Sequence, residues 1–411
     1  MGGCAEAGDG TARRSRRTGR GRGRGVFTGA QLALLAGGFL VNLGTFAVYP
    51  YLAVLLRDRL DAGMAQVGMV LGAATLVQFA SAPFTAAFAE RAGLKRSLLL
   101  ATTLYLLGAV TYLYGAGSPA LTVLALFLSC GAGALYSPAF RGYLVHAAPP
   151  VRRPRLVSAG NAAGHLGIAV GPVAGALFLH EPGRLFTANT VLYAVLAIGH
   201  LFLRPEPAGP AGEGPGVEPF RRVLRGLAAV PFAATVLTHY LYMQFYQYLS
   251  VYAEGRLATA GYGLIMMGYA LGLVVLQPLL AGRIADIGHP TAMVIGFGCM
   301  AAGMTAFATG GPVGMAAGAL AMSAGTAVLF LKNDLEALAR SRRSATVAFG
   351  QQRLAVGVGA LLSGVLGGRL YGVLERAGLL PGFWLAVAAQ CVLLPPLLLA
   401  VLRRPRRPSR R

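Results

Sequence analysis

Four ionisable side chains inside long apolar stretches of this sequence are candidates for chemistry: Arg141, His165, His239 and Arg353. Ionisable groups are costly inside a lipid bilayer, and those that occur there usually serve a function. His239 lies near the middle of its stretch, and because imidazole titrates near neutral pH it is a candidate proton carrier. The alternative for both histidines is a hydrogen bond between packed helices, and Arg353 can instead extend its guanidinium to the membrane surface.

Phenol and amide groups follow His239 along the same stretch. Tyr240, Gln244 and Gln247 share one face by helical spacing, and a polar aromatic face suits an amphipathic organic ligand. The alternative is an aromatic belt at the outer membrane interface. Amides elsewhere that can add hydrogen-bond donors to such a site are Asn42, Gln351 and Gln352.

Carboxylates are missing from the apolar stretches, since all 14 Asp and Glu residues lie outside them or at their ends. Asp334 and Glu336 flank the inner end of one stretch. A purely cationic ligand would therefore lack a counter-ion, which favours neutral, zwitterionic or anionic compounds.

Motifs of common enzymes are absent: the sequence has no GxxxxGK[ST], HExxH or GxSxG pattern. The four cysteines are far apart and form no CxxC pair, so we expect neither a metal site nor a cofactor. A membrane-embedded enzyme such as an acyltransferase is the alternative class, but His146 and Arg141 near one interface have no acid beside them. We expect that the protein is not an enzyme.

The composition indicates that these residues are carried by membrane-spanning helices. Of the 411 residues 55% are hydrophobic and 12% are charged, about half the charged share of soluble proteins. A bilayer core requires about 20 apolar residues per helical span, and the sequence predicts an all-α membrane protein with twelve transmembrane helices. The expected spans are 28–56, 66–88, 97–116, 119–147, 157–180, 185–203, 227–253, 260–282, 290–309, 312–332, 345–372 and 380–402.

Lys and Arg gather in alternate loops, with clusters at 91–96, 152–155 and 332–343. Cytoplasmic loops carry such an excess, so both termini are expected in the cytoplasm. The strong preference for Arg over Lys, with abundant Gly and Ala, is typical of a GC-rich bacterial genome. The expected location is the plasma (inner) membrane.

The spans divide into two groups of six. Residues 28–203 and 226–402 are the expected six-helix bundles, and the Pro- and Gly-rich segment 204–225 is the expected cytoplasmic linker. Residues 1–27 and 403–411 are expected to be basic cytoplasmic tails, the first disordered. The arginines of the first tail favour anionic lipid headgroups over nucleic acid. We expect a monomer in the lipid bilayer.

Two local motifs stand out. Gly167, Gly171 and Gly175, with Pro172 among them, form a smooth stripe at helical spacing that lets a neighbouring helix approach closely. Such stripes also occur in membrane helices without transport roles. The second motif follows the second span and contains Glu90, Arg91, Gly93, Lys95 and Arg96; its plain alternative is an ordinary positively charged cytoplasmic loop.

Together these motifs resemble the major facilitator superfamily of secondary transporters, in particular its drug–proton antiporters. The glycine stripe is similar to the GxxxGPxxGG motif of span five, with Ala176 in place of the last glycine. The second motif is similar to GxLADRxGRR, with Glu90 in place of the usual Asp, and Asp286 closes a shortened copy in the second half. The arginine common in span four is replaced by Phe127.

The resemblance implies two six-helix bundles around a central site that opens alternately to each side. It favours proton-coupled export of a small organic molecule, such as a drug or metabolite. An importer or an uncoupled facilitator is the alternative within the same class. The resemblance also implies that Glu90 and Arg91 latch the outward-facing state by docking at the start of span eleven, near Ser344.

Overall fold

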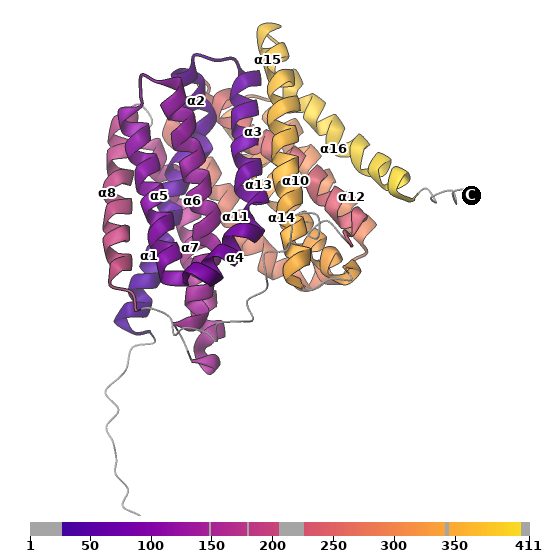
Figure 1. Ribbon diagram of the computed structural model, residues 1–411. Coiled ribbons are helices and arrows are strands. Elements are labelled where there is room, and N and C mark those ends of the chain that lie inside the picture. Colours follow the sequence, from indigo (N-terminus) through magenta and orange to yellow (C-terminus); the bar gives the residue numbers. More distant parts are fainter. Residues whose placement is uncertain (1–26, 148, 179–180, 205–225, 342–344, 404–411) are drawn as a thin grey trace, which may run out of the picture.

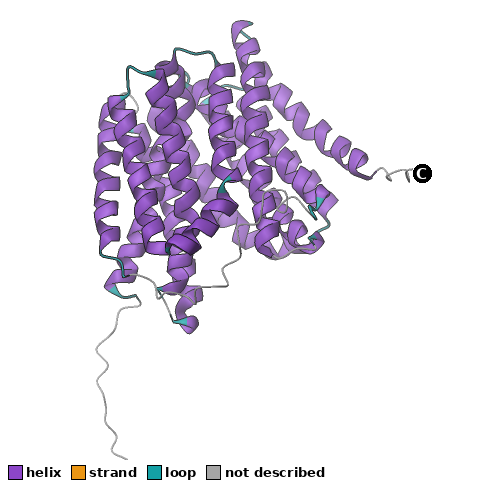
Figure 2. Ribbon diagram, in the orientation of Figure 1, coloured by secondary structure: helices purple, strands orange, loops and turns teal. Residues whose placement is uncertain are grey.

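The computed structural model describes residues 27–147, 149–178, 181–204, 226–341 and 345–403. Within these ranges every regular element is a helix (Figure 2). The expected disordered tail, most of the expected linker and most of the expected C-terminal tail lie outside the described residues.

The helices before residue 204 form the N-terminal half of the described chain. They are α1 (Gly29–Val48), η1 (Tyr49–Tyr51), α2 (Leu52–Leu60), α3 (Met64–Ala80), α4 (Ala82–Ala92), α5 (Leu94–Tyr114), α6 (Pro119–His146), η2 (Pro150–Arg152), α7 (Arg153–Ala176) and α8 (Pro182–Leu201).

The helices after residue 226 form the C-terminal half. They are α10 (Ala229–Ala253), α11 (Thr259–Asp286), α12 (His289–Phe307), α13 (Pro312–Arg340), α14 (Ala345–Leu362), η3 (Ser363–Gly367), α15 (Gly368–Arg376) and α16 (Leu380–Arg403).

Proline and glycine set many of the helix ends. Pro119, Pro182 and Pro312 each occupy the first turn of a helix, where the missing N–H has no helical partner in any case. Gly93 separates α4 from α5 with a φ of 92°, a left-handed value that glycine adopts without steric cost. Thr28 begins α1 with a reciprocal capping box to Gln31.

Nine helices of the described chain are long and apolar enough to cross a membrane, and the pair α3 and α4 forms a tenth candidate with a 46° bend. The first of the nine runs from Gly29 to Leu60 through α1, η1 and α2. The helices α7 and α10, with 24 and 25 residues, are not among the ten. The described part of the chain is therefore all-helical and has the candidate spans expected of a membrane protein.

The two halves lie side by side in Figure 1, the N-terminal half in indigo to magenta and the C-terminal half in pinkish red through orange to yellow. They meet where α7 packs on α11, and where α3 packs on α14, η3 and α15. We call the end of the molecule with the α4–α5 and α6–α7 connections the basic end, since Arg91, Arg96 and Arg152 lie there. The other end, with the α2–α3 and α15–α16 connections, is the opposite end.

Candidate functional site

A central cavity of about 700 Å³ lies between the two halves. Its wall comes from α1, α3, α4, α5, α6 and α7 of the N-terminal half and from α14 of the C-terminal half. On α1 it begins near mid-helix at Val41, and on α6 it continues to Arg141, five residues before the end of the helix at His146. The volume is within the range of about 300–1,000 Å³ that small-molecule sites occupy.

Four residues predicted from the sequence line this cavity: Asn42, Arg141, His165 and Arg353. Arg141, His165 and Arg353 have exposed side chains. His165 lies within electrostatic range of Arg141, and Arg141 lies within electrostatic range of Arg353. The cavity therefore brings together three basic side chains from α6, α7 and α14.

Arg353 links the two halves across the cavity. Its Cζ lies 5.6 Å from the ring centroid of Phe79 on α3, a distance at which a guanidinium is attracted to an aromatic face. Asp334 on α13 lies within electrostatic range of Arg353, but it is not part of the cavity wall. Arg353 is thus held at the cavity and does not need to extend toward the membrane surface.

Asn42 lies deeper, at the place where α1 and α7 pack together. Its Nδ2 donates a 2.8 Å hydrogen bond to the carbonyl oxygen of Gly38 one turn earlier. A Cβ at Gly164 would lie 3.3 Å from the same Nδ2, so the amide contacts α7 closely. Its side-chain oxygen can still accept from a molecule in the cavity.

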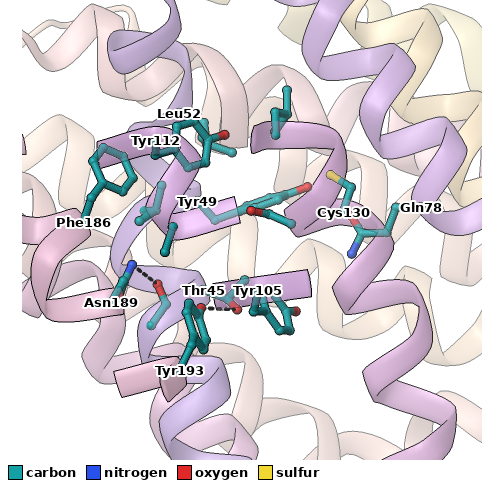
Figure 3. A pocket seen from close by; sticks show the side chains of 15 residues that line it. Thr45, Tyr49, Leu52, Gln78, Tyr105, Tyr112, Cys130, Phe186, Asn189 and Tyr193 are labelled. Atoms are coloured by element: carbon teal, nitrogen blue, oxygen red, sulfur yellow. Dashed lines mark hydrogen bonds between the residues drawn. The ribbon is translucent and has the colours of Figure 1, made fainter. Parts of the chain in front are cut away.

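A smaller pocket of about 50 Å³ adjoins the central cavity (Figure 3). We call it the tyrosine pocket, because Tyr49, Tyr105, Tyr112 and Tyr193 contribute to its wall. The central cavity and the tyrosine pocket share three wall residues, which are Thr45, Gln78 and Tyr105. All wall residues of the tyrosine pocket belong to the N-terminal half.

Hydrogen bonds and ring stacking fix the shape of the tyrosine pocket. The hydroxyls of Thr45 and Tyr193 are 3.3 Å apart, and Asn189 Nδ2 donates to the carbonyl oxygen of Gly44 at 3.2 Å (Figure 3). Tyr105 stacks on Tyr193 with ring centroids 4.9 Å apart. Sequence reasoning missed these residues, although aromatic and polar side chains in the middle of apolar stretches were a usable signal.

The predicted polar face of the seventh span lies elsewhere, since none of its members lines the central cavity. His239 Nδ1 donates a 3.0 Å hydrogen bond to the carbonyl oxygen of Thr235, and the imidazole stacks on the Phe330 ring with centroids 4.8 Å apart. Tyr240 donates a 2.6 Å hydrogen bond to Gln390 Oε1 on α16. The amides Gln244, Gln247 and Gln352 are buried.

His239 is nevertheless within electrostatic range of Arg353, which lines the central cavity. Gln247 lines a separate small cavity of about 10 Å³ with Tyr49 and Tyr246. The aromatic residues of α10 therefore contribute mainly to packing.

Contacts between the halves close the opposite end. Arg57 Nη1 on α2 forms a 2.8 Å ion pair with Glu375 Oε1 on α15. Tyr262 on α11 donates a 3.3 Å hydrogen bond to the carbonyl oxygen of Pro50. A Cβ at Gly364 would overlap the backbone of Gly68, so α3 and η3 are in backbone contact.

The predicted glycine stripe packs within the N-terminal half. A Cβ at Gly171 would lie 2.7 Å from Phe46 Cβ, and Cβ atoms at Gly167 and Gly175 would overlap the carbonyl oxygens of Phe39 and Ala47. The stripe thus lets α7 pack directly on α1. Pro172 presents its carbonyl oxygen to the Tyr51 hydroxyl, which donates at 2.6 Å.

The second motif lies at the surface of the basic end. Glu90, Arg91, Arg96 and Asp286 are exposed, and none of them is in a salt bridge with another described residue. Lys95 donates a 2.8 Å hydrogen bond to the carbonyl oxygen of Leu201 at the end of α8. The docking point near Ser344 lies outside the described residues.

Comparison with solved structures identifies the architecture. A mutant of the nucleoside transporter NupG superposes with a TM-score of 0.78 at 15% identity, covering 91% of this chain and 100% of that one. The peptide transporter POT in complex with sulfate gives 0.69 at 15% identity, covering 93% of this chain and 96% of that one. At this identity the likeness concerns the fold alone.

Sequence comparison finds relatives among bacterial proteins. Multidrug resistance protein MdtH from Sodalis glossinidius (strain morsitans) is 29% identical over 210 residues, which is 51% of this chain and 51% of the relative. MdtH from Salmonella arizonae is 28% identical over 209 residues, 51% of this chain and 52% of the relative. The match thus spans about half the length of these relatives.

A sequence profile that describes a whole family covers a larger part of the chain. The profile of the Major Facilitator Superfamily matches residues 34–330, which include most of the cavity wall, the tyrosine pocket and both motifs identified from the sequence. Membership in a transporter family does not favour the acyltransferase alternative. The chain belongs to the Major Facilitator Superfamily.

Proposed function

We propose that this protein is a secondary active transporter that exports a small organic molecule across the plasma membrane by alternating access, driven by protons. The two MdtH relatives are named multidrug resistance proteins, which supports a drug-like substrate and the export direction. The absence of a nucleotide-binding loop in the sequence supports an ion gradient as the energy source.

The proposed layout has twelve membrane helices in two six-helix bundles, residues 28–203 and 226–402, joined by a cytoplasmic linker at 204–225. The broken helices α1–η1–α2, α3–α4 and α14–η3–α15 each count as one span, and α7 and α10 complete the set. The basic end faces the cytoplasm of a bacterial cell, because Lys and Arg are concentrated there. We propose that the protein acts as a monomer.

The observation that carries the proposal is that the larger cavity between the halves, about 700 Å³, lies toward the basic end, whereas the cavity between them at the opposite end measures about 370 Å³. The halves touch through backbone and an ion pair at the opposite end, whereas the central cavity separates them toward the basic end. Alternating access requires two such states, with the contact and the cavity exchanged. In this proposal the structure is the state open to the cytoplasm.

The two motifs then have distinct proposed roles. The stripe of Gly167, Gly171 and Gly175 keeps α7 and α1 together as one rigid unit in both states. Glu90 and Arg91 are the latch of the outward-facing state. Their exposure fits this role, because in the cytoplasm-facing state the latch is released.

Two protonatable side chains next to Arg353 are the proposed coupling groups. Arg353 acts electrostatically on His239 of α10 and on Asp334 of α13. Protonation of either group changes the charge around Arg353. Proton binding can thereby be coupled to the conformational state of the transporter. Among the carboxylates of the described residues, Asp334 is the one that acts electrostatically on this arginine.

Dye efflux from cells or proteoliposomes tests the proposal. Export of ethidium and of fluorescein is followed with and without a proton uncoupler, in the wild type and in His239→Ala and Asp334→Asn variants. We expect uncoupler-sensitive export of at least one of the two dyes, and loss of that export in at least one variant. Flux that follows the dye gradient alone and ignores the uncoupler would contradict proton coupling, and it would favour an uncoupled facilitator.

Accessibility tests alternating access without a substrate. Asn42→Cys, on the cavity wall, is labelled with membrane-impermeant maleimides from each side of oriented vesicles. We expect labelling from the cytoplasmic side, and slower labelling from the outer side that increases when the outer contact is weakened. Labelling confined to one side under all conditions would contradict the transport proposal.

A further inference from the structure

The charge of the cavity wall is one-sided. Of the described residues that line the central cavity, Arg141 and Arg353 carry a permanent positive charge and His165 can acquire one, whereas none is Asp or Glu. Asp334 acts on Arg353 from behind the wall, so it can balance one arginine and not both. The wall therefore carries excess positive charge in a space partly shielded from water, where charges interact more strongly.

The two arginines come from different halves. Arg141 lies on α6 of the N-terminal half and Arg353 on α14 of the C-terminal half, and each acts electrostatically on the other. The repulsion between them is relieved when an anion lies between them. Guanidinium groups suit this role, because they bind carboxylate, sulfonate or phosphate through two parallel hydrogen bonds.

The rest of the wall suits an aromatic body. Phe46, Phe79, Tyr136 and Phe349 line the same cavity, and Tyr105 continues the aromatic wall into the tyrosine pocket. Tyr105 is already stacked on Tyr193, so its ring is rigidly held. A planar molecule with one charged end would meet the arginines with that end and the aromatic rings with its body.

We propose that the substrate is an organic anion, whose negatively charged group binds between Arg141 and Arg353 while its aromatic body lies against the rings toward the tyrosine pocket. The inference rests on the proposed transport function and specifies the chemical class that the cavity selects. It excludes the organic cations for which a cavity needs a carboxylate counter-ion.

Binding at this position also has a mechanical consequence. An anion held by arginines of both halves draws α6 and α14 together, and it interacts more strongly when the cavity is narrower. A ligand shifts a conformational equilibrium by its difference in affinity for the two states. The anionic group therefore favours closure of the basic end, which is the step that begins export.

The test measures binding by fluorescence anisotropy in nanodiscs of phosphatidylcholine, which has no net charge. The probes are fluorescein, an anion, and tetramethylrhodamine methyl ester, a cation with the same three-ring body. We expect saturable fluorescein binding that is weakened by salt, and weaker binding of the rhodamine. Arg353→Gln and Arg141→Gln should each weaken fluorescein binding about tenfold or more, the effect of losing one charge-assisted hydrogen bond.

Matched variants separate charge from folding. Arg353→Lys keeps the charge without the planar fork and should restore part of the affinity. Arg369→Gln removes the same charge from the same span, on α15 outside the cavity wall, and should leave fluorescein affinity unchanged. Thermal unfolding of each variant identifies any that fails to fold. If Arg353→Gln does not fold, the fluorescein affinity of Arg353→Lys is compared with that of the wild type instead.

Four outcomes would overturn the inference. They are no saturable fluorescein binding, fluorescein binding that both glutamine variants retain, tighter binding of the rhodamine, and loss of fluorescein binding when part of the lipid is replaced by phosphatidylglycerol. The last would mean that an anionic lipid headgroup occupies the arginines. Labelling of Asn42→Cys from both sides would still support transport in each case, so the two proposals fail separately.

Discussion

Replacing Gly364 with alanine should open the contact that closes the opposite end. The added Cβ would overlap the carbonyl oxygen of Gly68, and it would lie 2.9 Å from the carbonyl carbon of Gly68 and 3.1 Å from Gly72 Cα. All these atoms belong to the backbone of α3, in the other half of the chain, and no side-chain rotation removes the overlap. The halves must move apart at this point.

The size of the effect follows from the cost of overpacking. Forcing one extra methyl group into a close-packed contact costs about 1–3 kcal/mol. This cost falls on the state in which the opposite end is closed, because α3 and η3 separate when it opens. A free-energy difference of this size changes the ratio of the two states by about 5–150-fold, away from the cytoplasm-facing state.

Maleimide labelling measures that ratio. Ser137→Cys reports access from the basic end, because Ser137 is exposed on the wall of the central cavity, and it is placed in a background without the four native cysteines. Gly364→Ala should lower its labelling rate severalfold. Gly350→Ala on the same span is the control, since its Cβ would lie at an ordinary 3.6 Å from Pro83 Cγ. Equal rates in both variants would refute the claim that the glycine contact is a gate.

Substitutions at three further places test other parts of the mechanism. Arg57→Gln or Glu375→Gln should also lower the labelling rate at the basic end, by no more than about fivefold, because part-exposed ion pairs contribute about 0.2–1 kcal/mol. Exchanging the two residues should restore the wild-type rate. A rate that is not restored would mean that the effect does not come from the ion pair. The Cβ added by Gly175→Ala would overlap Ala47 of its own half, so the variant should have a lower melting temperature and an unchanged rate of maleimide labelling. A changed labelling rate at an unchanged melting temperature would contradict a purely structural role of the stripe. Glu90→Gln should raise cytoplasmic labelling of the cavity, and an unchanged rate would count against the latch.

Apolar length and helix breakers predicted the course of the chain well. The helices that begin at Pro119 and Pro312 start at the expected positions, and the helix that begins at Pro182 starts three residues before the expected 185. The bend at Ser81 and the turn at Pro50 were not predicted, because an apolar run has the same hydropathy whether the helix inside it is straight or broken. Proline marks such a break only when neighbouring helices leave room for the bend.

The cavity was predicted less well, for a physical reason. In a soluble helix the apolar face marks the interior, whereas a membrane helix is apolar on all sides, so its sequence does not show which face meets the cavity. Tyr240 and Gln244 share a face by spacing, yet that face packs against α16 and η3. Arg141 and Arg353 were recognisable as exceptions because a charge in an apolar stretch needs water or a partner.

The glycine stripes show how one sequence pattern can have two mechanical uses. Gly167 and Gly171 on α7 recur with the same spacing as Gly364 and Gly368. The first pair packs on α1 inside one half, whereas the second packs on α3 across the contact between the halves. Close backbone packing is in both cases what glycine permits, but only a contact between halves is broken when the cavity changes sides. Motif resemblance alone therefore cannot distinguish a glycine that stabilises a bundle from one that sets the balance between states, and the partner helix decides which role it has.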